Sequence, residues 1–291
     1  MLKRLGIYLN EMFPITAFLG TVLTAIAVEL VYLKLFGHKA TFNFQILLPA
    51  FTLTFVSLLI RVMDEFKDYQ DDLTNFPHRP LPSGRVKRED LQSLGFFCVM
   101  MIIFLSLTSM PLLLWSLVTL AFTGLMLKWF FIEDRMRKSL PLAFVSHHPI
   151  VFFNFTYLII ACMQMYPDVD FSKALLILPV CFMFTNWEIV RKIRAPEQET
   201  AYTTYSMIFG PRVAMSLSLA IQAIFNGTVL AIFHNLNTPM VVRWIYVILQ
   251  LILIYPSLKF LFTLKLRNPL KPNAEGQILL VVGFLLIAAI L

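Results

Sequence analysis

The sequence has 291 residues, of which 58% are hydrophobic and only 14% are charged, and its mean hydropathy is +0.76. A soluble domain carries about 25% charged residues, so this chain is too apolar to cover itself with polar surface, and a soluble globular protein is excluded. Repeated apolar stretches of about 20 residues, each long enough to cross a hydrocarbon core of about 30 Å, explain the composition directly.

The apolar stretches predict nine transmembrane helices. The expected fold class is an all-α membrane protein, with the helices arranged around a central cavity and residues 1–291 forming a single domain. In chain order, the expected spans are 15–33, 44–62, 91–107, 111–129, 142–165, 173–190, 213–233, 242–263 and 275–291. The two longest connections follow the second and sixth spans, so both are expected on the same side of the membrane.

The basic residues predict which side that is. Twenty of the 24 Lys and Arg residues fall in the N-terminal segment and in the loops that follow the even-numbered spans, and four fall on the other side. Cytoplasmic loops carry such an excess, so the N-terminus and both long loops are expected in the cytoplasm. The net charge of +7 is then mostly topological, and no nucleic-acid partner is expected. A bacterial source would place the protein in the inner membrane.

Four chemically distinctive residues lie inside the predicted spans. Cys98, Cys162 and Cys181 have no metal-ligand spacing and are expected to be small buried hydrophobic residues. Glu29 lies in the first span, where an acid is a functional hypothesis by default. Snorkelling of Glu29 towards the outer interface is the favoured interpretation.

A cluster of carboxylates follows the second span. If that helix continues, Asp64, Asp68 and Asp72 lie at i, i+4 and i+8, within roughly 80° of arc, with Arg61 one turn earlier. Like charges at this spacing destabilise a helix, so the stripe needs a compensating cation. Mg²⁺ suits it, because this ion binds one or two carboxylates together with substrate phosphates. The alternative is a solvated acidic helix end.

Two further cationic elements could bind an anion. The segment 79–85, Arg-Pro-Leu-Pro-Ser-Gly-Arg, predicts a stiff turn that presents two guanidinium groups, whose planar shape suits phosphate oxygens; a purely structural turn is an equal alternative. Lys128 ends the fourth span. A lysine there is usually a snorkelling anchor, and it becomes a diphosphate ligand only if the other clusters face it.

A second charged cluster closes the sixth span. Glu188, Arg191 and Lys192 lie at i, i+3 and i+4, which places them on one helix face. Such mixed charge suits a site for both a metal ion and a diphosphate, and an ion-pair network at a helix end is the alternative. Pro196 then ends the helix, and residues 197–205 are expected to form a loop that could fold over the site.

Together these motifs resemble the UbiA superfamily of intramembrane prenyltransferases. That family has nine transmembrane helices, a motif Asn-Asp-x-x-Asp-x-x-x-Asp after the second, and a following Arg-Pro-Leu/Ile-Pro-Ser-Gly. Residues 64–72 fit the first motif with Asp for Asn and Glu for Asp, and residues 79–85 fit the second element fully. Motif spacing and helix count together cover most of the chain.

The resemblance implies a Mg²⁺ cofactor and a prenyl diphosphate substrate. It implies that the metal bridges the aspartates to the diphosphate, that Arg79 lies near the phosphates and that Lys128 contacts them. The candidate metal ligands are Asp64, Asp68, Asp72 and Glu188. The candidate diphosphate-binding residues are Arg61, Arg79, Lys128, Arg191 and Lys192. The candidate catalytic residues are Asp68, Lys128 and Glu188.

The sequence departs from the family at its second motif, Asp-x-x-x-Asp after the sixth helix. Glu188 can stand for the first acid, but Lys192 occupies the second position. Either Glu197 or Glu199 supplies the missing ligand, or Lys192 replaces a metal ion with its own charge. The departure puts the number of metal ions in doubt and indicates a divergent branch.

The expected activity is therefore Mg²⁺-dependent transfer of a prenyl group from a prenyl diphosphate to a lipophilic acceptor, foremost an aromatic ring, at the cytoplasmic side of the membrane. One alternative is a membrane terpene cyclase of the same superfamily, which ionises the diphosphate without an acceptor. The other is a cation or lipid transporter. A transporter predicts carboxylates deep in several spans, whereas here they gather at the cytoplasmic ends.

Overall fold

The structure is a computed structural model that describes residues 1–200 and 203–291. Its regular elements within that part of the chain are all helical. Nine stretches in the described residues are helical, long and apolar enough to cross a membrane. They are Ile15–Leu35, Phe44–Lys67, Arg88–Ser106, Met110–Leu127, Leu140–Met165, Phe171–Val190, Pro211–Asn235, Met240–Thr263 and Lys271–Ile290. The nine predicted spans are confirmed.

The helices are numbered in chain order. The α-helices are α1 (Leu2–Met12), α2 (Ile15–Leu35), α3 (Phe44–Lys67), α4 (Tyr69–Asn75), α5 (Arg88–Ser106), α6 (Met110–Leu127), α7 (Glu133–Arg137), α8 (Leu140–His147), α9 (Ile150–Met165), α10 (Ala174–Ile177), α11 (Phe182–Val190), α12 (Tyr205–Phe209), α13 (Pro211–Asn235), α14 (Met240–Thr263) and α15 (Lys271–Ile290). The 3-10 turns are η1 (Trp129–Phe131), η2 (Phe171–Lys173), η3 (Leu178–Cys181) and η4 (Pro196–Gln198).

Two spans are interrupted where the sequence predicted one continuous helix. The fifth is divided into α8 and α9 at Pro149, and the sixth into η2, α10, η3 and α11, with Pro179 in its 3-10 stretch. Proline has no N–H to donate and its ring clashes with the preceding turn, which accounts for both breaks. The charged cluster that closes the sixth span therefore lies at the end of a helix of only nine residues, α11.

The chain folds into two compact units. The first comprises Met1–Glu29, Phe42–Arg135 and Thr156–Pro167, and the second comprises Leu30–Thr41, Met136–Phe155 and Asp168–Leu291. Helices α2 and α9 contribute residues to both. That the chain acts as a single domain stays a prediction.

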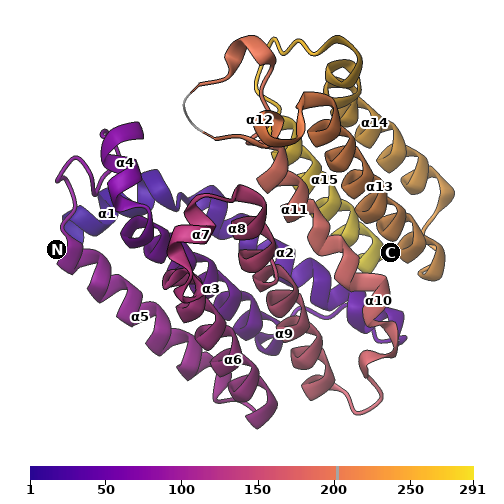
Figure 1. The fold of residues 1–291 in the computed structure, drawn as a ribbon. Helices are drawn as coiled ribbons and strands as arrows, with labels where there is room; N and C mark the ends of the chain where they lie inside the picture. The colour runs from indigo at the N-terminus through magenta and orange to yellow at the C-terminus, as the bar shows by residue number, and fades with distance from the viewer. Residues whose placement is uncertain (201–202) are drawn as a thin grey trace. The chain divides into compact units, whose positions relative to one another are not determined.

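In the first unit, α3 packs along α5, and α6 contacts both (Figure 1). Val56, Leu59 and Val62 of α3 share a buried core with Leu94 and Cys98 of α5. These residues follow one another at helical spacing, so each helix buries one continuous face. The packing fixes the end of α3, where the first acidic cluster begins.

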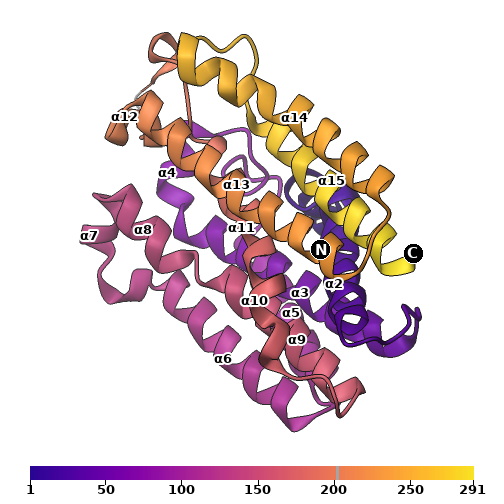
Figure 2. The ribbon, with the colours of Figure 1, turned by 90° about the vertical axis from the view of Figure 1, so that its right-hand side faces the viewer.

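In the second unit, α13, α14 and α15 run side by side (Figures 1 and 2), and α11 packs against α13 and α15. Three buried amides close a ring of hydrogen bonds: Asn186 Nδ2 donates to Gln277 Oε1 over 3.1 Å, Gln277 Nε2 to Gln222 Oε1 over 2.9 Å, and Gln222 Nε2 to Asn186 Oδ1 over 3.3 Å. Polar groups within a membrane need such partners. The ring ties α11 to both neighbouring helices just before its charged end.

The four distinctive residues of the spans are all buried. Cys98, Cys162 and Cys181 are inaccessible to solvent, as predicted. Glu29 is also fully buried, and neither of its carboxylate oxygens has a hydrogen-bond partner among the described residues. The snorkelling interpretation is therefore wrong, because a snorkelling carboxylate would reach an exposed interface.

Candidate functional site

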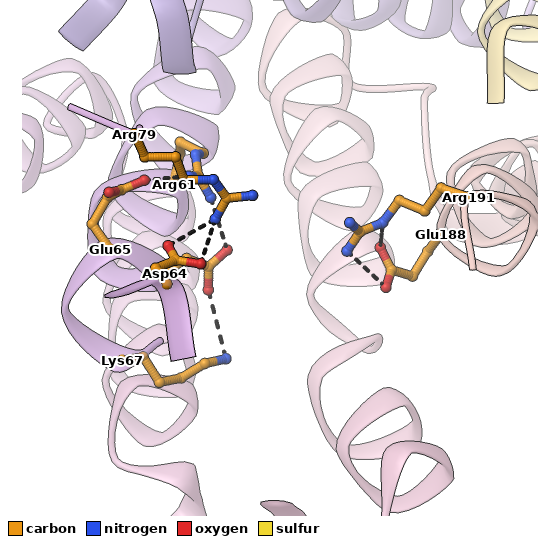
Figure 3. Close-up of polar contacts among 8 residues, drawn as sticks. Arg61, Asp64, Glu65, Lys67, Arg79, Glu188 and Arg191 are labelled. Atoms are coloured by element: carbon orange, nitrogen blue, oxygen red, sulfur yellow. Dashed lines mark hydrogen bonds and ion pairs between the residues drawn. The ribbon is translucent and has the colours of Figure 1, made fainter. Parts of the chain in front are cut away.

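The last turns of α3 carry an ion-paired cluster. Arg61 Nη2 donates to the carboxylate of Glu65 one turn later, and Arg61 Nη1 lies 4.0 Å from Asp64 Oδ2. Glu65 is 1% exposed, and no described residue forms a hydrogen bond with its second oxygen. A buried carboxylate is costly unless it is paired, so Arg61 is held beside the acids (Figure 3).

Asp68 interrupts the helix. The condition for the acidic stripe, one helix that continues through Asp64, Asp68 and Asp72, is met only in part, because α3 ends at Lys67 and α4 begins at Tyr69. Asp68 has backbone angles of φ −99° and ψ 10°. The helical hydrogen-bond pattern is nevertheless kept, since the Asp68 N–H donates to the Asp64 carbonyl and the Asp72 N–H to the Asp68 carbonyl, both over 2.9 Å. A local bend at Asp68 separates the two helices.

The carboxylate of Asp68 is the one acid of this cluster without a protein partner. Among the described residues, none donates a hydrogen bond to it or forms an ion pair with it. Burial raises its pKa to about 6, Lys67 opposes the shift, and the negative charges of Asp64, Asp72 and Asp71 add to it. A half-buried carboxylate among like charges is stabilised by a cation, and Lys67 supplies only part of that stabilisation, since the pKa of Asp68 stays raised.

Asp72 is paired instead. It is 5% exposed, and Arg79 Nη1 lies 2.6 Å and 2.7 Å from its two carboxylate oxygens. The Arg79 guanidinium also lies 4.1 Å from the ring centre of Phe76. Arg79 is thereby fixed at the start of its turn, and its side chain is 29% exposed.

The turn after Arg79 is held by hydrogen bonds and contains one glycine in the left-handed region. Ser83 N–H donates to the Arg79 carbonyl over 3.0 Å, and Gly84 adopts a φ of +74°, which glycine tolerates without steric cost. Arg85 pairs with the carboxylate of Glu11 in α1, with Nη2 at 2.9 Å from Oε2. Both guanidinium groups of the turn are therefore paired with carboxylates, and its use as an anion clamp stays a prediction beside the purely structural turn.

Lys128 follows the last residue of α6, as predicted. Its side chain is exposed, and no described residue forms a hydrogen bond or ion pair with its ammonium. The next three residues, Trp129 to Phe131, have φ values of 49°, 49° and 60°. This conformation is strained for residues other than glycine. It reverses the chain so that the Trp129 ring lies 4.4 Å from Lys67 Nζ.

A small hollow lies beside this contact, between α3 and α6. Its polar side chains include Asp64 and Lys67, whose Nζ lies 3.5 Å from Asp64 Oδ1. The remaining lining residues are Ile60, Met63, Thr123, Met126 and Leu127.

The second unit holds the other charged cluster. Arg191 Nε and Nη2 donate to the two oxygens of Glu188 over 2.6 Å and 3.0 Å (Figure 3), and Lys192 Nζ lies 3.1 Å from Glu188 Oε1. The guanidinium carbon of Arg191 lies 5.1 Å from the ring centre of Trp187. The three charged residues meet on one face, as their spacing predicts, with two cations around one carboxylate.

The loop that follows folds back onto α11. Tyr205 N–H donates to the Lys192 carbonyl over 3.0 Å. Glu199 accepts hydrogen bonds from the hydroxyls of Thr204 and Ser206 over 2.6–3.0 Å, and Glu197 is exposed. The predicted loop over 197–205 includes residues 201 and 202, which lie outside the described residues. The carboxylate of Glu199 is already engaged within the loop.

The acids do not form a ready-made metal centre in the described residues, because no three His, Cys, Asp or Glu side chains there lie close enough to hold an ion. Oxygen ligands and an unpaired carboxylate nevertheless suit Mg²⁺, which completes its shell with waters and substrate phosphates. Asp68 belongs to the first unit and Glu188 to the second, so their convergence on one metal stays a prediction.

Two residues of the cluster were not among the predicted site residues. Glu65 occupies the first acidic position of the UbiA superfamily's first aspartate motif. Asp68 and Asp72 follow it at i+3 and i+7, a helical spacing from which Glu65 could have been identified as part of the cluster. Tyr8 lies in α1, a helix that the sequence analysis did not predict. The charges of Arg61 and Glu65 act on its buried hydroxyl. The apolar residues of α1 at helical spacing were the available signal.

Comparisons with known proteins support the fold. No model of a known protein family matches the sequence, and neither does any curated protein. Among solved structures, the chain is similar to a digeranylgeranylglyceryl phosphate synthase, with a TM-score of 0.62 and 17% identity over 99% of both chains. It is also similar to an apo UbiA homologue from Aeropyrum pernix K1, with a TM-score of 0.66 and 14% identity over 93% of this chain and 98% of the other.

These similarities extend over nearly the whole chain, so they concern the architecture rather than a shared fragment. The predicted fold is confirmed: the part of the chain that the structure describes has the UbiA-type fold, with nine helices long and apolar enough to span a membrane. At 14–17% identity, a shared fold does not carry a substrate with it.

Proposed function

We propose that this chain, which has the UbiA fold, is a Mg²⁺-dependent intramembrane prenyltransferase that takes its prenyl group from a prenyl diphosphate. The observation that supports the proposal most is the carboxylate of Asp68, which is half-buried among acids and forms no ion pair with any described residue. The nearby cations that could bind an anion, Arg61, Arg79 and Lys128, are supplied by the same unit. A site with one unsatisfied acid and several basic groups suits a metal ion bound to a polyanion.

In this proposal, the metal ligands are Asp64, Asp68 and Asp72 from the first unit and Glu188 from the second. When bound, Mg²⁺ supplies Lewis-acid stabilisation of the departing pyrophosphate. Lys192 stands at the position where the UbiA superfamily has a second acid. Its Nζ lies 3.1 Å from Glu188 Oε1 and neutralises that carboxylate. This contact supports a site in which a lysine takes the place of a second metal ion, since Glu199 is engaged elsewhere.

The basic side chains bind and orient the diphosphate. Arg79 offers the exposed part of a guanidinium already fixed by Asp72, and Arg61 and Lys128 lie at the ends of α3 and α6. From the second unit, Arg191 and Lys192 add positive charge. Groups aligned before the substrate arrives stabilise developing charge without reorganising during the reaction. The apolar helices behind them exclude water, which protects the allylic cation from hydrolysis.

The prenyl group then passes to a lipophilic acceptor. An aromatic ring is one acceptor class, and a prenylated glyceryl phosphate is another, suggested by the digeranylgeranylglyceryl phosphate synthase that shares the fold. The site lies at the cytoplasmic side of the membrane, in the inner membrane if the source is bacterial.

The direct test is incubation of the purified protein with prenyl diphosphates of different chain length, with and without Mg²⁺. Released pyrophosphate and organic products are measured, with an aromatic acid or a geranylgeranylglyceryl phosphate as the acceptor. We expect Mg²⁺-dependent pyrophosphate release together with a prenylated acceptor. A hydrocarbon or terpenol formed without any acceptor would instead indicate a terpene cyclase, and a protein that releases no pyrophosphate from any donor would refute the proposal.

The raised pKa of Asp68 predicts how pH controls metal binding. Since its pKa is about 6 against a reference value of 3.8, Mg²⁺ must compete with a proton below pH 6, and its affinity should fall by up to about tenfold per pH unit there. Between the two values the native state binds more protons than the unfolded state. The unfolding free energy of the metal-free protein should therefore decrease as the pH rises from 4 to 6.

Excess Mg²⁺ should reverse that loss above pH 6, because it binds the ionised carboxylate of the folded protein. Thermal unfolding in detergent between pH 4.5 and 7.5, with Mg²⁺ or with a chelator, measures both effects. Asp68→Asn is the matched control and should remove the pH dependence of the Mg²⁺ effect. A Mg²⁺ effect that is equal at all pH values would contradict this prediction.

A further inference from the structure

Helix α1 contacts three separate parts of the first unit's site through one face. Arg4, Tyr8 and Glu11 lie at i, i+4 and i+7, a spacing that places them on the same side of a helix. Arg4 reaches the start of α5, Tyr8 the end of α3, and Glu11 the turn between α4 and α5.

The first contact fixes the start of α5. Arg4 Nε and Nη2 donate to the two carboxylate oxygens of Asp90 over 2.6 Å and 2.9 Å. Asp90 is 3% exposed and also accepts the N–H of Lys87 over 3.1 Å, which caps α5. A two-pronged pair of this kind fixes orientation as well as distance. The helix is thereby held in one register against α5.

The second contact reaches the turn that carries Arg79. Both terminal nitrogens of Arg85 donate to Glu11, and the guanidinium holds the pKa of Glu11 below its usual value. Arg85 also donates to the His78 carbonyl over 2.5 Å and to Ser83 Oγ over 3.0 Å. Arg85 therefore closes the turn around Arg79 from both ends, and Glu11 holds Arg85 in that position.

The third contact is Tyr8. Its side chain is fully buried, and its hydroxyl has no hydrogen-bond partner among the described residues. Tyr8 shares its buried core with Leu59 and Val62 of α3, so it packs against the helix turns that carry Arg61 and Glu65. Glu65 Oε2 is also buried and has no hydrogen-bond partner among the described residues. Buried polar groups without a partner are costly to retain, which favours a use for both groups in the site.

We propose that α1 is a positioning helix for the diphosphate-binding half of the site, in which Tyr8 orients the Arg61–Glu65 pair and Glu11 orients, through Arg85, the turn that carries Arg79. This inference rests on the proposed function. Apolar packing supports the arrangement, because Leu5, Leu9 and Met12 contact the same core as Val62 of α3 and Leu81 of the turn. If α1 served packing alone, its polar contacts could be exchanged without an effect on anion binding.

A charge exchange between Glu11 and Arg85 tests the second contact. The variants are Glu11→Arg, Arg85→Glu and the double variant, and the control is Glu89→Arg, which changes the net charge equally at an exposed residue of α5. Two readouts are needed: KM and kcat for the prenyl diphosphate, and the Kd of inorganic pyrophosphate with Mg²⁺ measured by calorimetry, which requires no turnover. Each single variant should raise KM and Kd by about fivefold or more, and the exchange should restore most of the loss.

Tyr8→Phe tests the third contact, since it removes only the hydroxyl and keeps the ring. We expect a KM and a pyrophosphate Kd raised by about threefold or more, with no loss of unfolding temperature, because the removed hydroxyl has no hydrogen-bond partner among the described residues. Tyr255→Phe, at a 60% exposed residue of α14, is the control. If Tyr8 served packing alone, both constants would stay unchanged, because the ring is kept.

The outcomes separate the two proposals. Wild-type protein that binds pyrophosphate in an α1-dependent manner but transfers no prenyl group would refute the proposed function and keep the positioning role. Transfer that is indifferent to Glu11, Arg85 and Tyr8, or an exchange that restores nothing, would overturn the positioning role. Wild-type protein that neither binds pyrophosphate nor releases it would overturn both.

Discussion

Replacing Asp68 by asparagine should abolish Mg²⁺-dependent pyrophosphate release while making the metal-free protein more stable. Asparagine keeps the shape of the side chain and removes its charge. Since no described residue forms an ion pair with that carboxylate, and since burial raises the pKa of Asp68 to about 6 despite the nearby charge of Lys67, the ionised carboxylate is unfavourable in the folded protein at neutral pH. Its removal relieves this cost. The same change deletes the ligand that most needs a cation, so we expect a loss of kcat/KM of about 10³-fold or more.

The matched control is Asp71→Asn, which removes the same charge three residues further along at an exposed position. It should retain most of the activity. Pyrophosphate release and thermal unfolding are measured for both variants with and without Mg²⁺. The expected signature for Asp68→Asn is a higher unfolding temperature without metal and no further gain when Mg²⁺ is added. An Asp68→Asn variant that retains wild-type turnover would remove the metal site from the proposal.

Much of the fold could be predicted because the membrane imposes simple rules. An apolar run of about 20 residues must be helical to satisfy its backbone, and all nine spans were found this way. The interruptions of the fifth and sixth spans were harder to predict from the sequence. Pro149 and Pro179 are visible in the sequence, yet prolines are tolerated within membrane helices when neighbours satisfy the freed carbonyls. Pro49 inside α3 and Pro256 inside α14 are examples. Which proline breaks a helix depends on its packing partners.

In the candidate site, contacts within one helix could likewise be predicted and contacts between distant segments could not. Spacing along one helix placed Glu188, Arg191 and Lys192 together, because i, i+3 and i+4 contacts are local. Contacts between distant segments were not predictable. The sequence of the turn does not distinguish Arg79 from Arg85 as a possible anion ligand. In the structure, Arg85 pairs with Glu11, which lies 74 residues earlier in the chain, whereas Arg79 pairs with Asp72 of the acidic cluster. When several acids are available, tertiary packing decides which of them a given cation pairs with.

Replacing Arg79 by methionine should impair the protein in two separable ways. Methionine retains much of the apolar volume but leaves Asp72 buried without its partner. Loss of one member of a buried ion pair costs about 3–5 kcal/mol. Because the Arg79 side chain is 29% exposed, we expect a smaller loss of about 2–3 kcal/mol in the free energy of unfolding. The loss of one guanidinium at the diphosphate should lower kcat/KM by about 10²-fold or more.

A second substitution separates the two effects. In Arg79→Met/Asp72→Leu the unpaired charge is gone, so the stability measured by denaturant titration in detergent micelles should recover. Turnover should remain low, because neither residue can now contact the metal or the diphosphate. Arg79→Lys keeps a positive charge near Asp72 but loses the planar group that contacts Asp72 and Phe76, and it should be intermediate in both measurements. Recovery of turnover together with stability in the double variant would mean that Arg79 only balances Asp72, and that the phosphates are bound by other cations.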